Sequence, residues 1–265
     1  MSQRLPDILY KILFGTSPPP RKTVALANLY RVVNARTRVG LRVPFRIVDA
    51  RVIPRTENLP YTNLGKVVET AVLYMDIRGS TELHTYTSQV AVAKILKASL
   101  GEMARVARHH GAYIRGFAGD RIMIVTEQGE QAASTALEIA ISMRDVVQKV
   151  LNPTFQSHLN RSISVGIGID YGAMLAIKVG MQRTPEHSDL VWVGIPANVA
   201  SKITDAANPD EIVLSSSAHG RVDQSQYPAG LWTARQLQIA GQQLRVYALA
   251  GHVSFGEALT RAGLA

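Results

Sequence analysis

The order of apolar segments between residues 70 and 169 constrains the fold more than any other feature of this 265-residue chain. Residues 70–76 form an apolar run of strand length, and residues 88–110 repeat apolar side chains at the spacing of an amphipathic helix. Two strand-like runs follow at 112–117 and 121–126, then a helix at about 130–150 and a β-branched strand at 161–169. This order predicts an α+β fold with a ferredoxin-like βαββαβ core and an antiparallel-rich sheet.

Shorter elements extend the pattern on both sides of this core. We predict a hairpin near residues 173–179, a strand at 190–193, a helix at 196–206 and strands at 212–214 and 244–249. Prolines interrupt the first 60 residues, where only residues 23–38 have a helical pattern. The predicted organisation is a basic N-terminal extension at 1–65, one domain at 66–252 and a C-terminal tail at 253–265.

Composition limits the chemistry and the partners. The chain has no cysteine, so a bound metal must be held by oxygen or imidazole ligands. No apolar run approaches the roughly 20 residues of a membrane span, and the first residues lack a cleavage site, so we expect a cytoplasmic protein. Of the net charge of +9, residues 1–60 carry 11 Lys and Arg against three acids. An anionic membrane or nucleic acid is therefore an alternative partner, but no known binding motif supports nucleic acid, and a segment that lines a triphosphate pocket would look the same.

Two acids occupy special places in the predicted topology. Asp76 closes the first strand, Asp120 lies in the turn between the next two strands, and those strands are expected to be neighbours. Such a carboxylate pair suits one or two Mg²⁺ or Mn²⁺ ions that bridge phosphate oxygens, although either acid taken alone is more typical of an ordinary turn residue. The adjoining loop offers a glycine for close backbone approach and free N–H groups for phosphate, at Arg78, Gly79, Ser80 and Thr81.

Four segments together resemble a known family. The sequences AVLYMDIRGST at 71–81, RGFAGDR at 115–121, VGIGIDYG at 165–172 and WVGIPANVASK at 192–202 are similar, in order and spacing, to motifs of class III nucleotidyl cyclases. The resemblance implies a lyase that converts a nucleoside triphosphate into a 3′,5′-cyclic monophosphate and pyrophosphate, as a head-to-tail homodimer with two metal ions in each interfacial site. It implies metal ligands on one subunit at Asp76, Ile77 and Asp120, and catalytic residues on the other at Asn198 and Lys202.

Three departures from the usual family pattern bear on the substrate. Lys202 stands where the family usually has an arginine, and Gly116 and Val191 stand where purine cyclases read the base. The pattern resembles the pyrimidine cyclases of bacterial anti-phage signalling, whose cyclic UMP or cyclic CMP activates a separate effector.

The resemblance also suggests which basic side chains contact the substrate. Either Arg115 or Arg121 could donate to a pyrimidine carbonyl, and Arg245 could contact the triphosphate, but each is also typical of a surface arginine. An atypical adenylate or guanylate cyclase, and a nucleotide-binding module without turnover, remain alternatives.

Overall fold

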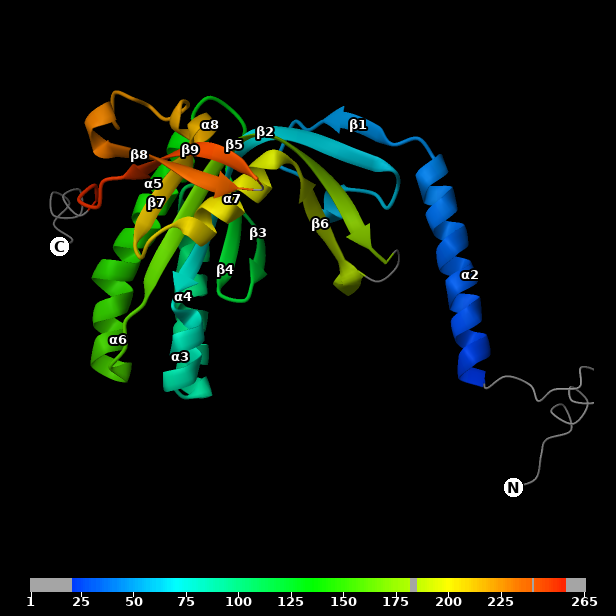
Figure 1. The fold of residues 1–265 in the computed structure, drawn as a ribbon, viewed down its shortest axis with the longest axis horizontal. Coiled ribbons are helices and arrows are strands. Elements are labelled where there is room, and N and C mark those ends of the chain that lie inside the picture. Colours follow the sequence, from blue (N-terminus) through cyan, green and yellow to red (C-terminus); the bar gives the residue numbers. More distant parts are fainter. Residues whose placement is uncertain (1–20, 182–184, 240, 256–265) are drawn as a thin grey trace, which may run out of the picture. The chain divides into compact units, whose positions relative to one another are not determined.

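A nine-stranded sheet forms the centre of the larger of two units into which the chain divides (Figure 1). The computed structural model describes residues 21–181, 185–239 and 241–255. The smaller unit, residues 1–46, contains helix α2 (Arg21–Arg42), which confirms the helix predicted at 23–38. The larger unit, residues 47–265, contains the other elements.

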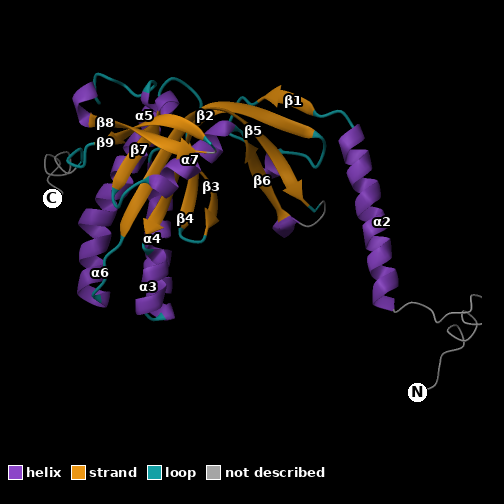
Figure 2. Ribbon diagram, viewed as in Figure 1, coloured by secondary structure: helices purple, strands orange, loops and turns teal. Residues whose placement is uncertain are grey.

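In the larger unit, the strands and helices predicted between residues 70 and 169 follow one another in the predicted order (Figure 2). Its strands are β1 (Arg46–Asp49), β2 (Leu64–Arg78), β3 (Tyr113–Ala118), β4 (Arg121–Val125), β5 (Ser164–Gly180), β6 (Ser188–Val193), β7 (Glu211–Ser215), β8 (Trp232–Ile239) and β9 (Gln242–Leu249). Its α-helices are α3 (Ser80–Tyr86), α4 (Gln89–His109), α5 (Ala132–Val146), α6 (Asn152–Leu159), α7 (Ile195–Ala206) and α8 (Ser216–His219). A π-helical turn, η2 (Val147–Leu151), joins α5 to α6, and short 3₁₀ turns are η1 (Thr56–Asn58), η3 (Pro185–His187) and η4 (Ala229–Leu231).

The sheet has the strand order β3-β4-β2-β5-β7-β9-β8, with β1 paired to β2 and β6 paired to β5. The pair β5–β7 is parallel, whereas β2–β4, β2–β5, β3–β4, β5–β6, β7–β9 and β8–β9 are antiparallel. This topology confirms the predicted α+β fold with its antiparallel-rich sheet. It places β2 between β4 and β5, so the strand that carries Asp76 is central.

Strand β5 corrects one prediction. Residues 173–179 do not form a hairpin of their own, because β5 runs unbroken from Ser164 to Gly180. Fourteen consecutive residue pairs join it to β2, from Arg78↔Ser164 to Gly65↔Ile177, so the chain does not turn at Gly172. The turn comes after β5, and the returning strand is β6.

The two faces of the sheet are covered by different helices. Along β2, Leu73, Met75 and Ile77 join a core cluster with residues of α4 and α5, whereas Val68 and Val72 join a second cluster with residues of α7. This alternation follows from the two-residue repeat of a strand buried on both faces. Helix α7 thus lies on the opposite face of the sheet from α4 and α5.

Residues just outside both ends of the predicted domain contact the folded unit through packing or hydrogen bonds. Ile53 and Leu59, which precede the predicted boundary at residue 65, are each 2% exposed and belong to the α7-side cluster. At the other end, the backbone N–H of Phe255 and the hydroxyl of Ser254 both donate to Asp145 on α5, at 2.8 Å. Residues 1–20 of the predicted extension and 256–265 of the predicted tail lie outside the described residues.

Candidate active site

Asp76 lies near the end of β2, a central strand of the sheet. It lies two residues before the end of β2, and its Cα pairs with that of Arg121 at the start of β4. Asp120 immediately precedes Arg121 in the β3–β4 turn, so the fold brings the two acids to neighbouring positions as predicted. Gly119 in this turn has a φ of 65°, a conformation that favours glycine.

Two arginines flank the Asp76 carboxylate. Arg78 Nη1 lies 3.4 Å from one carboxylate oxygen and Arg121 Nε lies 3.3 Å from the other, and the Asp76 side chain is 16% exposed.

No group of three His, Cys, Asp or Glu side chains that could hold a metal ion occurs within the described ranges. A cation here would therefore depend on Asp76, Asp120, the Ile77 carbonyl and oxygens of a bound phosphate. These are hard oxygen donors of the kind that Mg²⁺ and Mn²⁺ take.

Arg121 connects the acid on β2 to helix α7. Its Nη1 donates to the hydroxyl of Ser201 at 2.9 Å, and its Nη2 donates to Asp205 at 2.6 Å. Burial disfavours the charged guanidinium, but hydrogen bonds to Asp205 and Asp76 outweigh this effect and raise the pKa of Arg121. Asp205 also accepts from Lys202 Nζ at 3.2 Å. Arg121 is thus engaged with three groups on β2 and α7.

The loop after β2 turns sharply into helix α3. Gly79 is its N-cap, with a φ of 68°, which favours glycine. The Arg78 side chain points elsewhere, because its Nη2 donates to the carbonyl of Thr204 near the end of α7. A Cβ at Gly166 would lie 1.8 Å from the Arg78 guanidinium, so glycine there makes room for this side chain. Ser80 opens α3, and the side chain of Thr81 is outside the described part of the chain.

Three predicted residues meet in one cavity. Asn198 and Lys202 lie one turn apart on α7, and together with Arg245 on β9 they line a space of about 690 Å³. The same cavity is lined by Ser215 and by Asp170, which is only 4% exposed. Burial raises the pKa of Asp170, against the opposing effect of hydrogen bonds from Ser215 and from the Tyr171 N–H. Neither Asp76 nor Asp120 lines this cavity.

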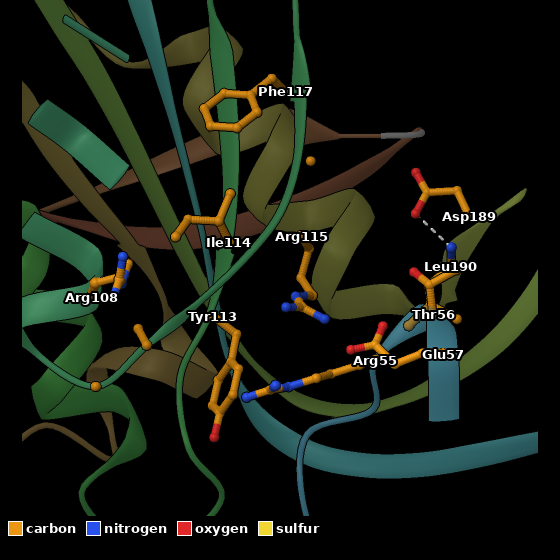
Figure 3. Close-up of a pocket in the computed structure, with 13 residues that line it drawn as sticks. Arg55, Thr56, Glu57, Arg108, Tyr113, Ile114, Arg115, Phe117, Asp189 and Leu190 are labelled. Atoms are coloured by element: carbon orange, nitrogen blue, oxygen red, sulfur yellow. Dashed lines mark hydrogen bonds between the residues drawn. The ribbon is translucent and has the colours of Figure 1, made fainter. Parts of the chain in front are cut away.

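Of the remaining predicted positions, Arg115 and Gly116 line another pocket, and Val191 lies next to two residues that line it. Arg115 and Gly116 on β3 line a space of about 640 Å³ together with Tyr113, Phe117 and residues 55–57 (Figure 3). Arg115 Nη1 donates to the carbonyl of Pro54 at 2.8 Å, and its Cζ lies 5.6 Å from the centre of the Tyr113 ring. Val191 on β6 is 42% exposed, and its neighbours Asp189 and Leu190 line the pocket.

The structure therefore separates the two arginines that the sequence left as alternatives. Arg115 faces a pocket, whereas Arg121 lies between Asp76 and α7. Sequence reasoning missed Tyr113, which lies on the same strand as Arg115, and the segment around Arg55, which approaches Arg115 only through the fold. A basic residue two positions from an aromatic one on the same strand was the available signal for Tyr113.

Comparison with known proteins shows which family the chain belongs to. Residues 64–251 match the family described as "Adenylate and Guanylate cyclase catalytic domain". A uridylate cyclase of Burkholderia cepacia is 27% identical over 192 residues, which cover 71% of this chain and 82% of that protein. A uridylate cyclase of Rhodovulum sp. (strain MB263) is 23% identical over 207 residues, which cover 74% and 85% of the respective chains.

Solved structures agree on the fold. The crystal structure of the guanylyl cyclase Cya2 is 22% identical, covers 71% of this chain and 94% of its own, and superposes with a TM-score of 0.63. No helix among the described residues has the length and apolar content that crossing a membrane requires. From the family match over most of its length, we conclude that this chain belongs to the class III nucleotidyl cyclases, which are lyases.

Proposed function

We propose that this protein is a uridylate cyclase, which converts UTP into 3′,5′-cyclic UMP and pyrophosphate. The observation that carries the proposal is the similarity to proteins named uridylate cyclase over more than 70% of the chain. The pocket beside β3 supports it, because an arginine lines that pocket where neither Gly116 nor Val191 offers a side-chain hydrogen bond to a purine.

The metal acids would serve as in other members of the class, which generally use divalent metal ions. We propose that Asp76, Asp120 and the Ile77 carbonyl hold two Mg²⁺ or Mn²⁺ ions. A bound metal would lower the pKa of the 3′-hydroxyl and polarise the α-phosphate. The chain itself orients Asp76 through Arg78 and Arg121, each of which contacts one carboxylate oxygen. The N–H groups after Gly79 are then placed to bind phosphate oxygens.

The catalytic side chains are proposed to act from the partner subunit. Asn198, Lys202 and Arg245 share one cavity that excludes Asp76 and Asp120, which supports a site completed by two copies of the chain. Asn198 would orient the ribose, while Lys202 and Arg245 would place positive charge on the triphosphate. Because lysine lacks the planar fork of arginine, Lys202 would stabilise the developing charge through single hydrogen bonds.

The base is proposed to contact Arg115. Arg121 is engaged by Asp76, Ser201 and Asp205, so it would act through the metal acid and α7. We further propose, from the resemblance to the anti-phage pyrimidine cyclases, that the cyclic UMP product activates a separate effector during phage defence.

The test is a four-way substrate comparison. The purified protein is incubated with Mn²⁺ and each of ATP, GTP, CTP and UTP, and the products are identified by mass. Cyclic UMP and pyrophosphate from UTP, at the highest rate of the four, is the expected result. Faster turnover of ATP or GTP would make the protein an atypical purine cyclase, and nucleotide binding without pyrophosphate release would make it a binding module.

A further inference from the structure

The segment that precedes β2 supplies a second arginine to the pocket beside β3. Arg55 and Arg115 are 60 residues apart in the chain, yet their Cζ atoms are 5.8 and 5.6 Å from the centre of the same Tyr113 ring. Figure 3 shows both side chains approaching Tyr113 from the same region of the pocket. Arg108 and two acids, Glu57 and Asp189, also line this pocket.

Arg55 is held in place by the core on both sides of it. Ile53 and Leu59 are each 2% exposed and pack with residues of β2, β6 and α7. Between them, the Pro54 carbonyl accepts the hydrogen bond from Arg115 Nη1. Because both flanks are buried, the backbone at Arg55 is fixed relative to β3 even though its own side chain is exposed.

The two acids that line this pocket act on Arg115 only at a distance. In the ranges that the structure describes, neither Arg55 nor Arg115 forms an ion pair with Glu57, Asp189 or any other acid. The Nε of Arg115 is buried and has no hydrogen-bond partner. Burial and the nearby Arg55 lower the pKa of Arg115, and these effects outweigh the attraction of Glu57 and Asp189, which raises it. Such an arrangement favours a ligand that brings hydrogen-bond acceptors.

We infer that Arg55 is a second base-specificity residue, which together with Arg115 recognises the carbonyl oxygens of uracil. Uracil presents acceptor, donor, acceptor along its O4, N3–H and O2 edge. Guanidinium groups are donors only, so two of them match O4 and O2, and a carboxylate such as Glu57 or Asp189 matches N3–H. Cytosine places an amino donor where uracil has O4, and this donor would face an arginine without an acceptor.

This inference rests on the proposed function, and it adds a role for the basic residues before the cyclase domain. The test compares Arg55→Ala with Arg51→Ala, a control at another exposed arginine of the same segment. For each variant, kcat and KM are measured with UTP and with CTP, and the thermal midpoint is recorded. Arg55→Ala is expected to raise the KM for UTP about tenfold, which corresponds to about 1.4 kcal/mol. The ratio of kcat/KM for UTP to kcat/KM for CTP should fall by a similar factor.

The outcomes separate this inference from the proposed function. If the parent protein makes cyclic UMP but Arg55→Ala keeps the UTP-to-CTP preference of Arg51→Ala, the role of Arg55 is wrong and the uridylate cyclase proposal stands. If the parent protein turns over no UTP, the proposed function fails first. Arg55→Lys keeps the charge without the fork, so a preference that falls in Arg55→Lys as well supports directional recognition over simple charge attraction.

Discussion

At the scale of single residues, the contacts of Asp76 explain how cation binding and helix α7 are linked. Arg121 contacts Asp76 with one edge of its guanidinium and Ser201 and Asp205 with the other. Arg78 also contacts Asp76, and it reaches the α7 carbonyl of Thr204. If Asp76 holds a cation as proposed, cation binding would be coupled to the position of the helix that carries Asn198 and Lys202.

Removing either acid is expected to abolish catalysis without unfolding the protein. In Asp76→Ala or Asp120→Ala one carboxylate ligand is lost, and stabilisation by bound metal is worth several kcal/mol, so turnover should fall about a thousandfold or more. Neither side chain lies in a core cluster, so the thermal midpoint should change little. The measurement is cyclic nucleotide production at saturating Mn²⁺.

Asp49→Ala is the matched control, because Asp49 is an exposed acid of the same unit. It should retain the turnover of the parent protein. Substantial turnover in Asp76→Ala or Asp120→Ala would remove these acids from the catalytic site.

The sequence predicted the acids but not their neighbours. The proximity of Asp76 and Asp120 follows from the predicted strand order, because β2, which carries Asp76, pairs with β4, which begins directly after Asp120. The contact between Arg115 and Pro54 spans 61 residues, and no local pattern encodes it. The choice between Arg115 and Arg121 likewise depends on the register Asp76↔Arg121 and on the position of α7.

At the scale of elements, the packing of β5 against α7 positions Asn198 and Lys202, the two side chains of α7 that are proposed to be catalytic. A Cβ at Gly168 on β5 would lie 2.5 Å from the Ala200 carbonyl oxygen and from the Thr204 nitrogen. Gly168→Ala must therefore push α7 away from the sheet, and overpacking of this kind costs about 1–3 kcal/mol. We expect a lower urea midpoint and a lower kcat, because Asn198 and Lys202 move with the helix.

A second glycine gives the opposite expectation. Gly101 lies in the interior of α4, it is exposed, and a Cβ there meets no atom within 4 Å. Gly101→Ala should raise the free energy of unfolding by roughly 0.5–1 kcal/mol and leave kcat unchanged. Equal urea midpoints for the two variants would contradict the close approach of β5 to α7.

The sequence does not predict strand β8 or the full length of strand β5. Strand β8 has a mostly polar sequence with half-buried and exposed side chains, so it lacks the alternation that reveals a strand. Strand β5 was divided in two because its glycines suggest a turn, whereas pairing with β2 keeps it extended. The buried strands and the amphipathic helix α4 were predictable because their apolar repeat is complete.

At the scale of the whole molecule, one copy of the chain holds the two halves of the proposed site apart. The acids lie beside the β3–β4 turn, whereas Asn198, Lys202 and Arg245 line a separate cavity. Several large apolar side chains near these regions are exposed, including Phe117 at 55% and Ile195 at 76%. Exposed apolar groups next to an incomplete site are consistent with the proposed homodimer.

Mixing two inactive variants tests that proposal. Asp76→Ala lacks a metal acid and Asn198→Ala lacks the ribose-orienting amide, so each homodimer should be nearly inactive. A mixed dimer with two composite sites keeps one site in which both residues are intact, because the two defects fall together in the other site. After random exchange at equal concentrations about half of the dimers are mixed, so about a quarter of the parent activity per total protein is expected.

Mixing Asp76→Ala with Asp120→Ala is the control, since both changes then affect acids of the same half-site and every site retains a defect. If exchange is demonstrated by a tagged subunit and the first mixture gains no activity over the control, the active site is built within a single chain.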